Sequence, residues 1–276
     1  MVKYKCTNIL GTFIFDNQYN IIMEGKTAES FDKNLSEPTT QKLLEAFKHK
    51  KYFKLFRDKN IEITKRQIKA SVTDDQLIIQ TISAIEDTKK TINTLSKRLR
   101  EWYGLYLPEL KTEDNHHFTD LVLEKKKSEI LAYLKRNSSM GADLEKADLQ
   151  PVFDLAKQIS ALFQFIAYQE TYLTKLMTRH CPNLSTLATP LVGAKLLNQA
   201  SGLKHLSEFP SSTIQLLGAE EALFRHLKTG ANSPKYGFLF QHPLILATPN
   251  KLRGKAARAL SDKIAIATKI DYFKGE

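Results

Sequence analysis

Two long stretches in the middle of the chain carry apolar residues at helical spacing. In the first, the apolar positions recur at intervals of 4, 3, 7, 3, 4 and 3, which is typical of one heptad stripe on a helix. We expect this helix to begin at a cap on Thr73 or Asp74 and to end at Gly104 and Pro108. The stripe is Ile78, Ile82, Ile85, Ile92, Leu95, Leu99 and Trp102, with a gap near Thr88 and Lys89.

The second stripe begins after Asp148, has its polar gap at Gln169 and ends at Pro182. Its members are Val152, Leu155, Ile159, Leu162, Ile166, Leu173 and Leu176. A shorter helical piece, roughly 120–136, lies between the two. Each stripe is narrow and needs a partner, so the pattern predicts an antiparallel coiled-coil arm over 71–183 with the short piece near its tip. An ordinary helical bundle would show the same pattern.

The first 70 residues predict a small α/β domain. A strand over 9–15, a turn over 16–20 and a second extended run over 21–23 precede a helix capped by Thr39 or Thr40. That helix runs to Lys48, and its expected apolar face is Leu43, Leu44 and Phe47. Bases alternate with aromatic residues over 48–57, which suits either nucleic-acid stacking or a core with buried aromatics; we favour the core.

The last part, 184–276, predicts short helices broken by glycine and proline, followed by a final helix over 255–270 with a face rich in alanine. With only 11 glycines and 9 prolines in 276 residues, an all-β fold is disfavoured. The expected class is therefore α+β, mostly α-helical: a small N-terminal α/β domain, a long antiparallel coiled-coil arm and an all-α C-terminal domain.

The chain carries 41 Lys and Arg against 30 Asp and Glu, a net charge of +11 that suggests an anionic partner. Residues 1–70 carry +6, residues 71–200 are neutral and residues 201–276 carry +5. The forty residues 222–261 hold seven bases and no acid. Because a solvated surface normally mixes both signs, this stretch indicates contact with a polyanion.

Several kinds of chemistry are not indicated by the sequence. It has no glycine-rich dinucleotide or phosphate loop, and its Cys and His residues do not fall at zinc spacing. Two cysteines, Cys6 and Cys181, cannot form a disulfide framework and suggest a reducing compartment. No apolar run suits a membrane span, and the first residues do not read as a signal peptide. We expect no catalytic constellation, no metal and no cofactor.

The C-terminal third closely resembles the Nop domain of the archaeal and eukaryotic box C/D ribonucleoprotein scaffold proteins. The residues that carry the resemblance are 210–243, including Ala222-Leu223-Phe224-Arg225, and 253–260. Upstream, 98–104, 107–110, 139–142 and 192–196 are also similar, so the resemblance covers about 70–276. The short chain is most similar to the single archaeal member. Glu221 departs from the usual Lys and Tyr236 from a common His.

The resemblance implies a non-catalytic scaffold in RNA-guided ribose 2′-O-methylation of rRNA and in rRNA processing. Its implied partners are box C/D guide RNA, the ribosomal-type protein bound to the kink-turn, a second copy of the chain and fibrillarin, the methyltransferase that would bind S-adenosylmethionine. Residues 1–70 would bind fibrillarin, 71–183 would dimerise, and 184–276 would bind RNA and the kink-turn protein. The implied location is cytoplasmic in an archaeal cell or nucleolar in a eukaryote.

Other classes stay open: a coiled-coil protein–protein adapter, a spliceosomal-type Nop-domain RNA-binding protein, or a methyltransferase in its own right, which no cofactor loop supports. The expected RNA-binding residues are Arg225, Lys228, Thr229, Gly230, Lys235, Gln241, Lys251, Arg253, Lys255 and Arg258. We expect the backbone amides of Gly230 and Gly237 to approach phosphate. Glu220, His226 and His242 are expected at the kink-turn protein, and Ile82, Ile85, Ile92, Leu95, Ile159, Leu162 and Ile166 at the dimer interface.

Overall fold

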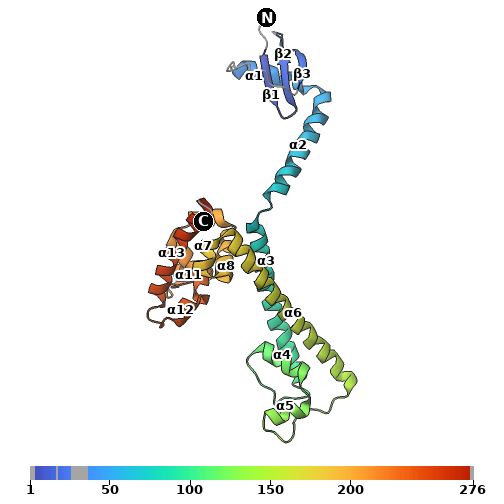
Figure 1. Cartoon of the computed structure of the whole chain (residues 1–276), viewed down its shortest axis with the longest axis vertical. Helices are drawn as coiled ribbons and strands as arrows, with labels where there is room; N and C mark the ends of the chain where they lie inside the picture. Colours follow the sequence, from blue (N-terminus) through green and yellow to red (C-terminus); the bar gives the residue numbers. More distant parts are fainter. Residues whose placement is uncertain (1–3, 17, 26–36, 274–276) are drawn as a thin grey trace. The chain divides into compact units, whose positions relative to one another are not determined.

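The computed structural model describes residues 4–16, 18–25 and 37–273. These residues are mostly helical and include one small antiparallel sheet (Figure 1). The expected fold class is therefore confirmed. The chain divides into two compact units, 1–73 and 74–276. Among the described helices, none is long and apolar enough to cross a membrane.

The sheet of the first unit has three strands in the order β1 (Tyr4–Asn8), β2 (Gly11–Phe15) and β3 (Ile21–Gly25). The strands predicted over 9–15 and 21–23 correspond to β2 and β3, whereas β1 was not predicted. Asp16 closes the turn between β2 and β3, because its Oδ1 accepts hydrogen bonds from the backbone N–H groups of Gln18 and Asn20, both at 2.8 Å. Such side-chain-to-backbone bonds are the reason that Asp is favoured in turns.

Helices α1 (Glu37–Glu45) and α2 (Lys50–Ser71) and the 3₁₀ turn η1 (Ala46–Lys48) complete the first unit. Its core contains Phe13, Phe15, Leu43, Phe47 and Tyr52. The ring of Phe47 meets that of Phe13 edge to face, with centroids 4.8 Å apart. The interpretation of the basic–aromatic stretch as core is confirmed for Tyr52.

Three details of this unit differ from the expectation. Leu44 is 52% exposed and Phe53 is 68% exposed, so neither joins the core. The helix begins at Glu37, before the expected caps Thr39 and Thr40. Helix α2 continues to Ser71 through a stretch so rich in charge that no clear apolar periodicity marked it.

The second unit is organised around two long helices, α3 (Asp74–Tyr103) and α6 (Lys146–His180), which match the two predicted helices. The start of α3 meets the end of α6, where Asp74 bonds Arg179 and Asp75 bonds His180, so the pair is antiparallel (Figure 1). The predicted stripes are buried in this contact, including Ile78, Ile82, Ile85, Leu99, Val152, Ile159 and Leu173. Trp102 is an exception at 38% exposed, and its neighbour Tyr103 is buried instead.

The polar gaps of the two stripes meet each other across the arm. Lys89 lies in the first gap and Glu170 lies beside Gln169 in the second, and Lys89 Nζ contacts Glu170 Oε1 at 2.8 Å. Both side chains are about 40% exposed. The interruption in each stripe is therefore one half of an interhelical ion pair.

The chain between the long helices forms α4 (Asn115–Glu124) and α5 (Lys127–Tyr133) rather than one piece over 120–136. The loop that follows is tied back to the segment just after α3. Glu109 accepts hydrogen bonds from the Ser139 hydroxyl at 2.8 Å and from the Met140 backbone N–H at 2.6 Å. Gly141 passes so close that a Cβ there would lie 2.2 Å from the carbonyl oxygen of Tyr106.

The remaining chain packs short helices around one long helix, α13 (Arg253–Phe273), which is two residues longer at its start and three longer at its end than predicted. The short elements are α7 (Pro182–Ala188), α8 (Pro190–Ala200), α9 (Leu203–Glu208), α10 (Ser211–Leu216), α11 (Glu220–Thr229), η2 (Phe238–Gln241) and α12 (Pro243–Ala247). Their buried side chains are continuous with the core of the arm. Asp271 of α13 is 5% exposed and holds the start of α7 by accepting from the backbone N–H groups of Asn183 and Leu184.

We expect the His180–Asp75 contact to make stability depend on pH. Nε2 of His180 lies 2.7 Å from Oδ1 of Asp75, and this hydrogen bond raises the pKa of His180 above its usual 6.5. Burial opposes the charged form of Asp75, but hydrogen bonds from His180 and from the Leu203 backbone N–H hold its pKa below the usual 3.8. The histidine contribution is present below pH 6.5 and is lost as pH rises through the folded pKa; the aspartate contribution is present above pH 3.8 and is lost as pH falls through the lower folded pKa.

His180→Gln should therefore lower the free energy of unfolding more at about pH 5.5 than at about pH 8.5. Trp102 is the single tryptophan and lies in α3, so its fluorescence in urea titrations reports this unit. The control is His117→Gln, because His117 is exposed on α4. An equal loss at both pH values would contradict the prediction.

Candidate nucleic-acid interface

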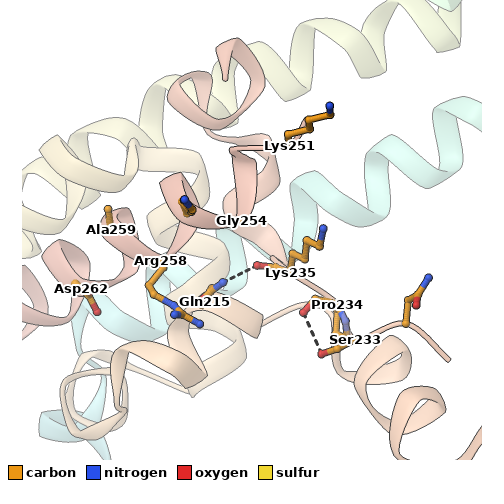
Figure 2. Close-up of a pocket in the computed structure, with 11 residues that line it drawn as sticks. Gln215, Ser233, Pro234, Lys235, Lys251, Gly254, Arg258, Ala259 and Asp262 are labelled. Carbon is orange, nitrogen blue, oxygen red and sulfur yellow. Dashed lines mark hydrogen bonds between the residues drawn. The ribbon is translucent and has the colours of Figure 1, made fainter. Parts of the chain in front are cut away.

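A basic groove lies where the loop before η2 crosses the first turns of α13 (Figure 2). Its volume is about 900 Å³. The groove is lined by Gln215, Asn232, Ser233, Pro234, Lys235, Lys251, Gly254, Lys255, Arg258, Ala259 and Asp262. Four of the residues expected to bind RNA, namely Lys235, Lys251, Lys255 and Arg258, thus line one groove.

Helical spacing explains the α13 side of the groove. Lys255 and Arg258 are three residues apart near the start of α13, so they share one face of the helix, and Lys251 lies in the turn just before it. Gly254 lies between them and leaves room for the opposite wall: a Cβ on it would be 3.5 Å from Cδ of Lys235. The aliphatic part of Lys235 therefore packs on the helix.

The loop side of the groove is fixed by backbone contacts. Gln215 of α10 donates from Nε2 to the carbonyl oxygen of Lys235 at 2.6 Å, as Figure 2 shows. The backbone carbonyl oxygen of Gln215 accepts from the backbone N–H of Gly237 at 3.0 Å. A Cβ on Gly237 would lie 1.9 Å from the carbonyl oxygen of Leu217. These contacts hold the loop against α10 and set the width of the groove.

Electrostatically, the groove combines four cationic side chains with one carboxylate, Asp262. Cations gathered in a concave surface raise the local concentration of anions, and a phosphate backbone offers many anions in a row. The groove is therefore suited to several phosphates of one strand.

Helix α11 and the glycine that follows it carry the next group of expected RNA-binding residues, Arg225, Lys228, Thr229 and Gly230, and all four are exposed. Arg225 borders a second hollow, of about 610 Å³, with Glu220, Glu221 and Phe238. Thr229 bonds the carbonyl oxygen of Arg225, and Gly230 ends the helix with φ of 69°. No residue of α11 is buried, and Phe224 and Leu227 are 60% and 69% exposed.

The backbone amides of the two glycines do not fit the expected role. The N–H of Gly230 donates to the carbonyl oxygen of His226 at 2.9 Å, and that of Gly237 donates to Gln215. Both amides are therefore used within the chain. We correct the expectation that they approach phosphate. Gly230 adopts the left-handed backbone conformation that ends α11, and Gly237 allows the loop backbone to pass close to the backbone of Leu217.

Two further expected RNA-binding residues are held by contacts within the chain. Gln241 accepts at Oε1 from Nζ of Lys195 at 2.7 Å, and the same Nζ pairs with Glu86 of α3 at 2.7 Å. Lys195 is only 8% exposed, so this cluster joins α8, η2 and the arm.

Arg253, the second of these two residues, lies outside the groove. Its guanidinium donates to the carbonyl oxygens of Thr248 and Leu246, at 2.9 and 3.2 Å, and stands over the ring of Phe240. These carbonyls belong to the end of α12 and the residue after it, so Arg253 stabilises that helix end.

The three residues expected at the kink-turn protein also hold local turns. His242 caps α12 by accepting at Nδ1 from the backbone N–H of Leu244 at 3.2 Å, and burial lowers its pKa. Nδ1 of His226 bonds the carbonyl oxygen of Ala231, which fixes the loop after α11. Glu220 accepts from the backbone N–H of Gly218 at 2.8 Å.

The residues expected at a dimer interface lie inside a single chain. Ile82, Ile85 and Ile159 are fully buried between α3 and α6, Ile92 and Ile166 are 3% and 8% exposed, and Leu95 and Leu162 pack against the same core. Their apolar surface is thus covered by the intrachain arm.

Sequence reasoning missed Gln215, Asn232, Ser233 and Asp262 of the groove. A signal existed for Asp262, because it follows Arg258 by four residues and so shares its helix face. Gln215 carried none, because its contact with Lys235 spans 20 residues. Among the residues that the structure describes, no three His, Cys, Asp or Glu side chains lie close enough together to hold a metal ion.

The groove falls inside a stretch that matches a known protein family. Residues 84–276 match the family model Nop, described as "snoRNA binding domain, fibrillarin". The chain belongs to the Nop family. The Nop match begins within α3 and includes α6, α11, the groove and α13.

Among its relatives, a NOP5 family protein of Methanocaldococcus jannaschii is 43% identical over 76% of this chain and 56% of its own length. Nucleolar protein 56 is 38% identical in Dictyostelium discoideum and 36% identical in Homo sapiens, over 72% of this chain and 41% and 37% of those proteins. The chain thus spans about half the length, or less, of these curated Nop relatives. A crystal structure of a fibrillarin/Nop5p complex superposes with a TM-score of 0.48 at 24% identity, over 99% of this chain and 93% of that one.

Proposed function

We propose that this Nop-family chain is a non-catalytic scaffold of a box C/D ribonucleoprotein, with the basic groove as its contact to guide RNA. The observation that carries the proposal is the convergence of Lys235, Lys251, Lys255 and Arg258 on one groove within the Nop match. When several Lys and Arg side chains contact one phosphate backbone, they hold the RNA in place without reading its sequence. Such contacts suit a protein that serves many guide RNAs.

The two units would have separate partners. Residues 1–70 would hold fibrillarin, which supplies the methyltransferase activity and binds S-adenosylmethionine, and 184–276 would bind the RNA together with the kink-turn protein. The description of the family model, which names fibrillarin, supports fibrillarin as a partner. The reaction served would be RNA-guided ribose 2′-O-methylation, in which this chain contributes position rather than chemistry.

A second copy would bind through the arm, residues 71–183. Because the stripe isoleucines are covered within the chain, the dimer contact falls on other side chains of α6. Phe165, Tyr168 and Tyr172 follow at intervals of three and four residues, so they share a face, and they are 41%, 70% and 38% exposed. This face is the apolar surface that the arm offers to a partner.

The exposed Phe224 and Leu227 favour a protein contact on α11, next to the groove. We assign this surface to the kink-turn protein. A pure protein–protein adapter would use the same surface without RNA, and the two functions differ in whether kink-turn RNA is needed for binding.

The test is a double variant, Lys255→Ala with Arg258→Ala, measured against a kink-turn RNA that already carries its ribosomal-type protein. Each lost phosphate contact should lower the slope of log affinity against log salt by about 0.9, so we expect a slope reduced by about 2 and binding weakened at moderate salt. The measurement is a series of binding isotherms at several salt concentrations.

The control variant is Lys204→Ala with Lys269→Ala, which removes the same charge from exposed positions outside the groove. It should leave the slope nearly unchanged. If the groove variant and the control behave alike, or if naked protein binds the kink-turn protein equally well without RNA, the proposal is wrong.

A further inference from the structure

The basic groove contains one carboxylate among its cations. Asp262 lies on α13 one helical turn after Arg258, and both line the groove with Lys255 (Figure 2). Residues four apart on a helix lie on one face, separated by about 6 Å along the axis. A strand that lies on Arg258 therefore passes within reach of Asp262.

This carboxylate opposes phosphate binding unless it meets a hydrogen-bond donor. Two negative charges a few ångströms apart repel each other even in water. Asp262 is exposed, and among the ion pairs formed within the described residues none includes it, so its carboxylate oxygens are open to a ligand in the groove. A ligand that fits the whole groove must therefore present a donor beside its phosphates.

Ribose supplies that donor. In an A-form RNA helix the major groove is too deep and narrow for side chains, whereas the shallow minor groove displays 2′-hydroxyls next to the backbone. A hydroxyl donates to a carboxylate in a strong, charge-assisted hydrogen bond. DNA has the phosphates but not this hydroxyl, so it would meet the same carboxylate with no donor.

We propose that Asp262 accepts a hydrogen bond from a ribose 2′-hydroxyl of the strand whose phosphates lie on Lys255 and Arg258, and that it makes the groove select RNA over DNA. The inference rests on the proposed function of the groove. In this arrangement the cations supply affinity for any phosphate backbone, and Asp262 supplies the discrimination.

If Asp262 has no hydrogen-bonding role, its removal has a different expected effect on binding. If Asp262 were only a solvated charge on α13, its removal would strengthen binding of every polyanion by the same factor, because one repulsive charge would be gone. If it accepts from a 2′-hydroxyl, its removal gains affinity only for backbones that lack the hydroxyl.

The experiment is a double-mutant cycle between protein and RNA. Single 2′-deoxy substitutions are placed along the helical stems of a protein-bound kink-turn RNA, outside the kinked internal loop, and binding is measured for the full chain and for Asp262→Ala. At one stem position the unchanged chain should lose about tenfold in affinity, and Asp262→Ala should lose nothing further there. Asp262→Asn, which keeps an acceptor oxygen, should retain part of the sensitivity.

Glu208→Ala is the charge-matched control, because Glu208 is exposed at the end of α9 and does not line the groove. It should keep the full sensitivity at that position. The inference is overturned if no stem position is sensitive in the unchanged chain, or if Asp262→Ala keeps the same penalty and tightens both RNAs equally. Either result leaves the proposed function standing as long as Lys255→Ala with Arg258→Ala still weakens RNA binding; if that variant binds normally, the proposed function itself fails.

Discussion

Gly237→Ala is expected to lower the free energy of unfolding by about 3 kcal/mol or more and to abolish the groove. The new Cβ would lie 1.9 Å from the carbonyl oxygen of Leu217 and 2.9 Å from that of Leu216. Both are backbone atoms, so no side chain can swing away to relieve the clash. The loop would have to leave α10, which breaks the hydrogen bonds between Gln215 and the segment 235–237.

Urea titration followed by Trp102 fluorescence measures the stability of this unit, and RNA binding measures the groove. Gly230→Ala is the matched control: its Cβ would have nothing within 4 Å, so only the positive φ of 69° is penalised, at about 1 kcal/mol. Equal effects of the two substitutions would show that the backbone approach at Gly237 is not as close as the structure has it.

Ile159→Ala should cost about 3 kcal/mol of the free energy of unfolding, within the range for deleting a buried aliphatic side chain. Ile159 is fully buried on α6, in the core that α6 shares with α3, so its removal leaves a cavity within the arm. The same urea titration measures the loss.

Ile266→Ala is the control, because Ile266 is 54% exposed on α13 and the identical chemical change should cost less than about 1 kcal/mol there. If Ile159→Ala were as mild as the control, the two helices would not be packed along the predicted stripes. If the loss of unfolding free energy were large only when it depends on protein concentration, Ile159 would be buried by a second copy of the chain instead.

The arm could be predicted from sequence because its information is local and repeated. A stripe at heptad spacing identifies both helices and shows that they need each other. It fails at Trp102, because an α-helix has 3.6 residues per turn and drifts by about 20° per heptad from a 3.5-residue repeat. By the end of α3 the buried position has moved to Tyr103, which is 1% exposed.

In the small first unit, the local sequence pattern does not predict which apolar residues are buried. Leu43 and Leu44 are equally apolar neighbours, yet the first is fully buried and the second 52% exposed. Only the position of the sheet decides between them. Strand β1 was missed because its pairing, Cys6 opposite Phe13 for example, is fixed by the partner strand rather than by its own alternation.

In the candidate site too, some residues could be grouped from local sequence and others could not. Lys255 and Arg258 could be grouped from the acid-free stretch because helical spacing puts them on one face, and Lys251 is close to them in sequence, in the turn before α13. Gln241 and Arg253 looked equivalent in that stretch, yet the first bonds Lys195, 46 residues away, and the second bonds the end of α12. A count of charges along the chain cannot separate a base that faces solvent from one that holds a carbonyl.

The Lys89–Glu170 ion pair also selects the alignment of the two long helices. An antiparallel pair slipped by one heptad would still bring apolar residues of the two stripes together, but it would place Glu170 opposite position 82 or 96, which are Ile82 and Ser96. Both are buried in the observed alignment, so the carboxylate would lose its partner and enter an apolar contact. One charged pair thus favours a single alignment of the two helices, and with it a single distance between α4 and α5 at one end of the arm and the short helices α7 and α8 at the other (Figure 1).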